Sequence, residues 1–252
     1  MSVVGDVNGL TQLHDTVYIV CQVSSTILRF NSTTYQRLTD ISVKDLKSPY
    51  DIVACQLASQ LYVCDYQLCI WRVAEDGEDV KRWLPKSPSD TFKPYTLSVT
   101  SARLLVTSYD THQLTQFDAD GIELRCVQLP DDIRPLHAVE SPTGTFVISQ
   151  YNKQLKEHQL IEVNTAGEQL RQFSRPLFTA HIAVDCHGKV LVSERDNRIL
   201  MLDNHLSLRR VIIDEHQLNY EQPLRLCYMA QSGQLLVGLV GGHVAVFDVL
   251  RR

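Results

Sequence analysis

The chain repeats one hydrophobic pattern six times, at intervals of 41 to 45 residues. In each repeat, an apolar run is followed ten to twelve positions later by a second apolar run and then by a third. The repeats begin at Val7, Pro49, Pro94, Pro135, Thr179 and Pro223. A period of this length that is built from strands is typical of a β-propeller, in which each repeat forms one blade.

The fifth repeat shows the pattern most clearly. Its apolar runs predict strands over residues 181–185, 189–193, 198–202 and 208–213, and the turn-forming sequence Asp-Cys-His-Gly separates the first two. In other repeats Gly77, Gly121 and Gly167 stand where the turn into the outer strand needs a positive φ. Four antiparallel strands with short turns make one propeller blade.

The sequence therefore predicts an all-β protein, a six-bladed β-propeller of four-stranded antiparallel blades that spans residues 1–252. The sixth repeat has room for only three strands, of which the last covers residues 243–249. Residues 2–6 precede the first repeat and include Val3 and Val4, so we expect them to pair beside 243–249 and close the ring. Closure of this kind removes open sheet edges. The alternative is a fourth strand that lies beyond Arg252 in a longer chain.

The fifth repeat also carries polar marks of a known repeat type. It contains Ile182-Ala183-Val184-Asp185, then Gly188, the apolar run 190–192 and Asp196-Asn197-Arg198-Ile199. This sequence resembles the NHL repeat, whose propellers also occur in the TRIM-NHL proteins. The resemblance implies a six-bladed propeller and extends over the whole chain in periodicity. In that family such propellers commonly sit at the carboxyl end of larger proteins, including ubiquitin ligases. No RING or B-box pattern is present here.

Composition and charge narrow the range of partners. Hydrophobic residues make up 44% and charged residues 21%, and the net charge of −5 creates no field that would attract DNA or an anionic membrane. No apolar run is long enough to span a membrane. The seven cysteines are scattered mostly through apolar strand patterns, which indicates reduced thiols in an intracellular protein. We therefore expect a cytoplasmic location.

The repeat phase also predicts a candidate binding site. Loops that lead into the innermost strands of a propeller surround one mouth of its central channel, so the first positions of each repeat should meet there. These positions supply eight candidate binding residues, which are Asn8, Tyr50, Asp51, Tyr95, Thr96, His137, His181 and Arg225.

Catalysis at that mouth is not expected. Lactonase-like propellers hold calcium with several carboxylates and amides, whereas this ring offers only Asp51 and Asn8. The amidating lyase of the NHL-like group uses zinc-binding histidines, one directly after the first proline of a repeat, where this chain has Tyr50. A catalytic zinc needs three protein ligands, and no third histidine joins His137 and His181 in the ring. A nucleophile elbow and phosphate-binding loops are also absent. We predict no catalytic residues, no metal and no cofactor.

Two binding functions remain. The first is a protein-interaction scaffold, in which the mouth or loops such as 85–90 and 152–157 contact a protein partner. The alternative is single-stranded RNA binding, because some NHL propellers bind RNA on a basic face, and Arg225, the two histidines and the two tyrosines offer cations and stacking rings. The acidic total charge and the acidic stretches 75–79 and 131–132 favour the protein scaffold.

Overall fold

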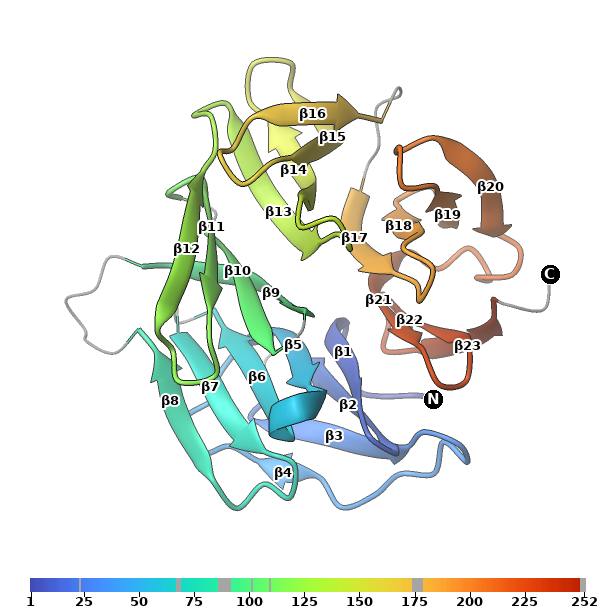
Figure 1. Cartoon of the computed structure of the whole chain (residues 1–252). Helices are drawn as coiled ribbons and strands as arrows, with labels where there is room; N and C mark the ends of the chain where they lie inside the picture. The colour runs from blue at the N-terminus through green and yellow to red at the C-terminus, as the bar shows by residue number, and fades with distance from the viewer. Residues whose placement is uncertain are drawn as a thin grey trace.

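Six antiparallel sheets are arranged around a central axis in the computed structural model of the chain (Figure 1). The structure describes residues 1–22, 24–66, 69–85, 92–100, 102–108, 110–173 and 179–249. Five sheets have four strands and the sixth has three. The predicted all-β, six-bladed propeller is confirmed.

In the first three blades the strands follow one another from the centre outwards. Blade one contains β1 (Val7–Leu13), β2 (Thr16–Cys21), β3 (Thr26–Asn31) and β4 (Ile41–Ser42). Blade two contains β5 (Pro49–Cys55), β6 (Gln60–Asp65), β7 (Cys69–Ala74) and β8 (Val80–Leu84), with the short 3₁₀ helix η1 (Gln56–Ala58) after β5. Blade three contains β9 (Pro94–Thr100), β10 (Arg103–Ser108), β11 (Gln113–Phe117) and β12 (Glu123–Gln128).

The last three blades keep the same order, and among the described residues the sixth has three strands. Blade four contains β13 (Ile133–Glu140), β14 (Phe146–Asn152), β15 (Glu157–Val163) and β16 (Gln169–Gln172). Blade five contains β17 (Thr179–Val184), β18 (Val190–Glu194), β19 (Arg198–Leu202) and β20 (Leu208–Ile213). Blade six contains β21 (Pro223–Met229), β22 (Gln234–Leu239) and β23 (Val244–Asp248).

Five inner strands begin at the first residue of their repeat, and one begins earlier. In blade five, β17 covers Thr179–Val184, where the sequence predicted a strand over 181–185. In blade four, β13 starts at Ile133 instead of Pro135. The reason is the long β14–β15 hairpin, because β14 continues to Asn152 and pairs there with Ile133. Of the predicted recognition loops, residues 153–156 form the turn of this hairpin, whereas 86–90 lie outside the described residues.

The hydrophobic core lies between neighbouring blades and explains the strand patterns. Strand β2 is buried along its whole length, because blades cover both of its faces, whereas the outer strand β12 is largely exposed. A typical cluster joins Val20 of blade one to Ile52 and Val63 of blade two. Among the described residues, no helix is long and apolar enough to cross a membrane.

The turn and thiol predictions agree with the structure. Gly77, Gly121 and Gly167 all have positive φ angles, as the turns before the outer strands require. All seven cysteines are free thiols. Four of them are buried, Cys227 is partly buried, and Cys126 and Cys186 are exposed.

The N-terminal segment closes the ring, as predicted, over a shorter stretch than 2–6. Ser2 forms an antiparallel bridge with His243, and Met1 exchanges two backbone hydrogen bonds of 2.9 Å with Val244. The Val3 amide donates to the Gly242 carbonyl at 2.7 Å. A Cβ atom on Gly242 would lie 2.3 Å from the Val3 carbonyl oxygen, so this close approach needs glycine. Pairing stops at Val244, and Figure 1 places the N-terminus beside the β22–β23 hairpin.

Candidate binding surface at the start of the inner strands

The eight predicted residues divide into two groups that face different surroundings. We call the buried group the channel ring, and its members are Asp51, Thr96, His137, His181 and Arg225. Each of them is the third residue of its repeat and is at most 8% exposed. The second group, Asn8, Tyr50 and Tyr95, is partly exposed, and we call it the rim. The predicted mouth is therefore an accessible rim above a buried ring.

A register irregularity near the start of each inner strand produces this division. Between Pro49 and Asp51, and again between Pro223 and Arg225, the pairing with the next strand shifts as at a β-bulge. Comparable shifts occur in the other four blades. A bulge inserts one extra residue and re-aims the neighbouring side chains. In the five repeats whose second residue has a described side chain, that residue thus stays partly exposed while the third is buried.

Asp51 joins blade two to blade three. Its Oδ2 accepts a hydrogen bond from the Leu97 amide at 2.9 Å, and its Oδ1 accepts one from the Ile52 amide at 3.0 Å. Thr96 repeats the link one blade further on, because its hydroxyl donates to the Leu136 carbonyl at 2.8 Å. Buried backbone groups require such partners, so these side chains serve the contact between blades.

The two histidines continue the same series. His137 Nδ1 accepts a hydrogen bond from the Ile182 amide, and His181 Nδ1 accepts one from the Leu226 amide, both at 3.3 Å. The two rings are stacked with their centroids 3.9 Å apart. His137 Nε2 lies 3.2 Å from the Leu97 carbonyl oxygen and donates to it. Each histidine therefore satisfies the backbone of the following blade.

Arg225 completes the ring by reaching across blade one. Its Nη2 donates to the Tyr50 carbonyl of blade two at 3.0 Å, and its Nε lies 3.9 Å from Asp51 Oδ1. Blade one has Gly9 at the corresponding position, where a Cβ would lie 2.6 Å from the Ile52 amide nitrogen. A larger residue would clash with blade two. The contact from the ring to blade two is therefore made by Arg225 of blade six and not by a side chain of blade one.

Burial sets the protonation of the ring. Loss of solvation is the main reason that the pKa of Asp51 is raised to about 6, and the Arg225 guanidinium opposes this rise. Burial, aided by the charge of Arg225, lowers the pKa of His137 to about 3. The pKa of His181 is lowered well below its usual value by burial, then by His137 and Arg225. Both histidines are neutral at pH 7.

Asp51, His137 and His181 come close enough to suggest a metal centre. Their potential ligand atoms all lie within 4.8 Å of one another. However, Nδ1 of each imidazole accepts a backbone N–H, so the proton of each neutral ring must reside on Nε2. A protonated nitrogen cannot bind a metal, so neither imidazole offers a free ring nitrogen in this arrangement. The donor set does not fit zinc.

The rim presents aromatic and amide groups at the mouth. The hydroxyls of Tyr50 and Tyr95 are hydrogen-bonded to each other, and their ring centroids are 4.7 Å apart. The Arg225 guanidinium lies 5.3 Å from the centroid of the Tyr50 ring, which holds that ring by a cation–π contact. Asn8 donates from Nδ2 to the Pro49 carbonyl at 3.0 Å. The rim is thus ordered and partly solvent-accessible.

The central channel below the ring is small and largely apolar. A cavity of about 170 Å³ is lined by His137 and His181 together with inner-strand residues such as Ile52, Val99 and Val184. Ligand sites for drug-sized molecules usually measure about 300–1,000 Å³. The channel therefore suits water or a very small molecule.

The sequence pattern found the positions but missed their division into ring and rim. Strict alternation after the first residue of each repeat gives no sign of a bulge. The one available signal is the proline at four of the six starts, because proline lacks the amide of a regular ladder and is common at bulges.

Comparison with known proteins identifies the fold but assigns the chain to no family. No family model matches the chain, and no curated protein matches it. A catalytically inactive variant of virginiamycin B lyase from Staphylococcus aureus, solved with quinupristin, has a TM-score of 0.68 at 14% identity, over 94% of this chain and 78% of that one. The WD40 β-propeller domain of Doa1 has a TM-score of 0.68 at 14% identity, and the match covers 98% of this chain and 94% of that one. A streptogramin B lyase has a TM-score of 0.66 at 12% sequence identity, and the match covers 100% of this chain and 85% of that one. At these identities the chain is similar to a lyase and to a WD40 domain in its β-propeller fold alone.

Proposed function

We propose that this propeller is a non-catalytic scaffold that binds a protein partner through its rim. The observation that carries the proposal is the hydrogen bonding of the channel ring. Asp51, Thr96, His137 and His181 each bond to the backbone of the next blade, so the residues best suited to chemistry hold the ring together. An active site needs groups that are free to meet a substrate.

The lyase fold neighbours do not outweigh this observation. Their identity to this chain is 12% to 14%, and one fold serves many unrelated activities. Here the two ring histidines carry their protons on Nε2, and their low pKa values make them poor general bases near pH 7. The chemistry of the ring therefore supports a structural role.

The rim has the features of a protein contact. Tyrosine is enriched in protein interfaces, because its ring buries apolar area while its hydroxyl makes a hydrogen bond. Tyr50 and Tyr95 are held together and are partly exposed, so little side-chain entropy would be lost on binding. WD40 propellers, to which the chain is similar in fold, commonly mediate protein interactions. A rigid aromatic pair at the channel mouth fits such a role.

We further propose that the blades are of the NHL type, on the motif of blade five. Asp185 accepts hydrogen bonds from the amides of His187 and Lys189, both at 2.8 Å, and so fixes the turn after the inner strand. Asn197 takes a positive φ of 58° in the turn before β19. These are structural roles for the polar marks of the repeat, and they are compatible with a scaffold.

Affinity capture with rim variants tests the proposal. Tyr50→Ala together with Tyr95→Ala should abolish capture of the partner from a cell extract, whereas Leu57→Ala should not. Leu57 is 81% exposed in η1, at the opposite end of β5, and provides a matched control. Equal capture by all variants would show that the rim does not contact the partner.

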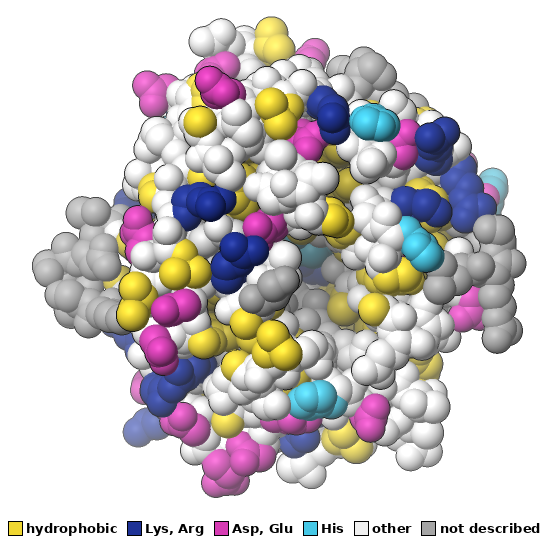
Figure 2. All heavy atoms as spheres, in the orientation of Figure 1, with side chains coloured by type: hydrophobic (Ala, Val, Ile, Leu, Met, Phe, Trp, Pro, Cys, Tyr) yellow, Lys and Arg dark blue, Asp and Glu magenta, His cyan; other side chains and the backbone are white. Residues whose placement is uncertain are grey.

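Single-stranded RNA binding is the alternative function for the channel mouth. Of the five residues predicted to contact RNA, His137, His181 and Arg225 are buried, which leaves the two tyrosines for stacking on bases. On the face shown in Figure 2, basic and acidic side chains are interspersed. A gel-shift assay with random single-stranded RNA at low salt should show no complex. A salt-sensitive complex that is lost in the tyrosine variants would replace the protein scaffold with an RNA-binding one.

A further inference from the structure

One groove between neighbouring blades is open, whereas its counterpart elsewhere in the propeller is closed. The open groove lies between blades four and five, at the turns 141–145, 187–188 and 204–206, on the face opposite the rim. We call it the interblade groove. Its volume of about 420 Å³ is within the range of about 300–1,000 Å³ that is usual for ligand sites. The counterpart between blades two and three, as the described residues form it, leaves no space for a water molecule.

One position on the second strand of each blade explains this difference. Tyr62 of β6 pairs with Val53, and Val147 of β14 pairs with Val139, and both partners are the fifth residue of their repeats. Tyr62 and Val147 are therefore equivalent. Tyr62 is 2% exposed, and its ring centroid lies 4.7 Å from that of Trp83. Aromatic rings thus fill the closed groove, whereas the smaller Val147 leaves the corresponding space open.

Contacts between blades four and five hold the walls of the interblade groove in place. Val147, Val190 and Leu206 line it and belong to the apolar cluster that joins the two blades. Arg171 of β16 reaches across and donates from Nη1 to the Asn204 carbonyl of blade five at 2.9 Å. The groove is therefore preformed, and it offers an apolar surface on which an aromatic ring can pack.

The negative charge in the groove is already balanced. Glu162 is 4% exposed, and it is the one carboxylate among the described residues that line the groove. Arg171 Nη1 donates to Glu162 Oε2 at 2.9 Å, and the Thr145 hydroxyl donates to Glu162 Oε1. Both oxygens of Glu162 thus have a donor within the protein, so the groove does not call for a cationic ligand.

The donors that remain in the groove indicate an anionic ligand. In the described part of the chain, Nε and Nη2 of Arg171 make no hydrogen bond, and this side chain is 42% exposed. The rings of His187 and His205 also line the groove and bond to no described residue. A guanidinium can bind a carboxylate through two parallel N–H bonds. Because Glu162 lies beside Arg171, a ligand with one negative charge is favoured over a ligand with two.

We propose that the interblade groove binds a small aromatic carboxylate. The ring of the ligand takes the space that Tyr62 and Trp83 fill in the closed groove, and its carboxylate pairs with Arg171. The site lies on the face opposite the rim and does not depend on the rim or on a protein partner. It adds a small-molecule site to the proposed scaffold.

Calorimetric titration with 2-naphthoate tests the proposal. The full chain should bind it with a Kd below about 1 mM, the weak limit for a ligand of this size. Naphthalene-2-carboxamide has the same shape without the charge and should bind at least tenfold more weakly. The backbone amide signals of Gly188 and Leu206, which border the groove, should shift in NMR spectra when naphthoate is added. Absence of naphthoate binding, or equal binding of the two compounds, would overturn the proposal.

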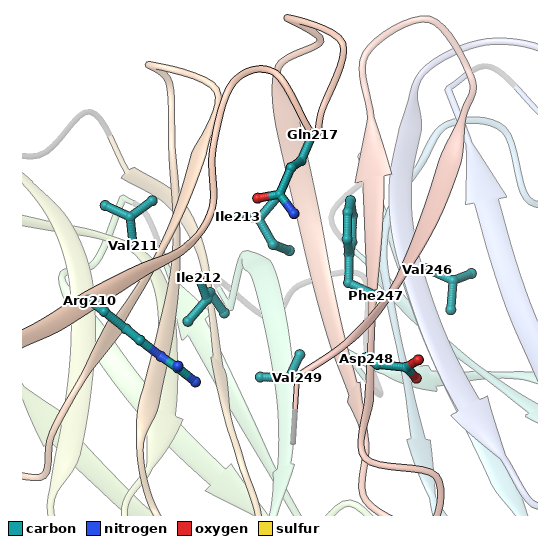
Figure 3. A pocket seen from close by; sticks show the side chains of 9 residues that line it. All are labelled: Arg210, Val211, Ile212, Ile213, Gln217, Val246, Phe247, Asp248 and Val249. Carbon is teal, nitrogen blue, oxygen red and sulfur yellow. The ribbon is translucent and has the colours of Figure 1, made fainter. Parts of the chain in front are cut away.

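Filling the groove tests where the ligand binds. Val147→Tyr introduces the side chain found in the closed groove and should weaken naphthoate binding at least tenfold. A second groove of about 460 Å³ lies between β20 and β23, and Val211 lines it (Figure 3). Val211→Tyr is therefore the matched control and should leave binding unchanged. If Val211→Tyr removes binding and Val147→Tyr does not, with both variants folded in thermal melts, the proposal is wrong.

Arg171→Gln separates recognition of the charge from recognition of the ring. It should lower naphthoate binding to the level of the carboxamide and leave carboxamide binding unchanged. If this variant does not fold because Glu162 loses its partner, the double variant Glu162→Gln and Arg171→Gln removes both charges and gives the same readout. A preference for naphthoate that persists would contradict the role of Arg171. The variant with Tyr50→Ala and Tyr95→Ala should bind naphthoate normally, which separates this site from the rim.

Discussion

The channel ring and the interblade groove use polar groups in opposite ways. The ring contains an aspartate, two histidines and an arginine, residues that often serve catalysis or metal binding, but their hydrogen bonds go to neighbouring backbone. The groove contains the same types, with a glutamate for the aspartate, yet among the described residues the His187 and His205 rings and Arg171 Nη2 make no hydrogen bond. Buried polar groups are nearly always paired, so residue type alone is a poor guide to function. Counting hydrogen bonds therefore tells more here than residue type.

Removing Asp51 should give the largest effect on the ring side of this comparison. Asp51→Ala leaves the Leu97 and Ile52 amides without an acceptor and Arg225 without its nearby anion. We expect a loss of about 3–5 kcal/mol in the free energy of unfolding, measured by urea denaturation. Asp131→Ala removes an exposed carboxylate and should change it by less than about 0.5 kcal/mol. Similar values for both variants would show that Asp51 is not part of the structure of the ring.

Acid should weaken the ring through its histidines. The folded pKa of His137 is about 3 against 6.5 for the free side chain, so the unfolded chain binds more protons below pH 6.5. His137 alone should then cost about 3 kcal/mol of stability between pH 6.5 and pH 4. His181, whose pKa is also lowered, adds to this loss. Asp51 opposes it, because its raised pKa of about 6 makes the folded state bind more protons between pH 6 and pH 4.

The variant His137→Asn isolates the histidine contribution. Its amide oxygen can accept the Ile182 amide in place of Nδ1, but it does not titrate. Urea unfolding at pH 7, 6, 5 and 4 should show a flatter pH dependence than that of the unsubstituted protein. An unchanged slope would mean that the pKa of His137 is the same in the folded and unfolded states, and the argument that it is a poor base near pH 7 would then need revision.

Shortening the N-terminus should lower the free energy of unfolding less than removing Asp51 does, and it tests the pairing with β23. A chain that lacks residues 1–3 loses the two Met1–Val244 hydrogen bonds and the burial of Val3. We expect a loss of about 2 kcal/mol in the free energy of unfolding. Ser2→Ala, which removes only an exposed hydroxyl, is the control. If the shortened chain melts at the same temperature, the segment does not close the ring.

The smallest effect on stability is expected at the rim. Tyr50→Phe removes only the hydroxyl that bonds to Tyr95 and should cost less than about 1 kcal/mol. A loss of 3 kcal/mol or more in thermal unfolding would place Tyr50 with the channel ring as a residue that holds the blades together. Partner capture should weaken even though stability is kept.

The sequence predicted most of the fold because propeller blades are local structures. Each blade uses consecutive strands joined by short turns, so the apolar period and the turn glycines were sufficient to locate them. The start of β13 was misplaced because its pairing depends on the length of the neighbouring hairpin. The structure places the eight candidate residues at the start of the inner strands, and their division into ring and rim depends on the bulges.

By itself, the sequence determined the number of blades, their order and the residues at the start of each inner strand. Only the tertiary structure decided which atoms of those residues are used in hydrogen bonds within the protein and which remain available for binding. His137 and His181 became hydrogen-bond acceptors because the ring places the amides of the next blade against their Nδ1 atoms. The N-terminal segment likewise pairs with β23 through the two backbone hydrogen bonds between Met1 and Val244. Both results depend on contacts between parts of the chain that are far apart in sequence, which no local pattern encodes.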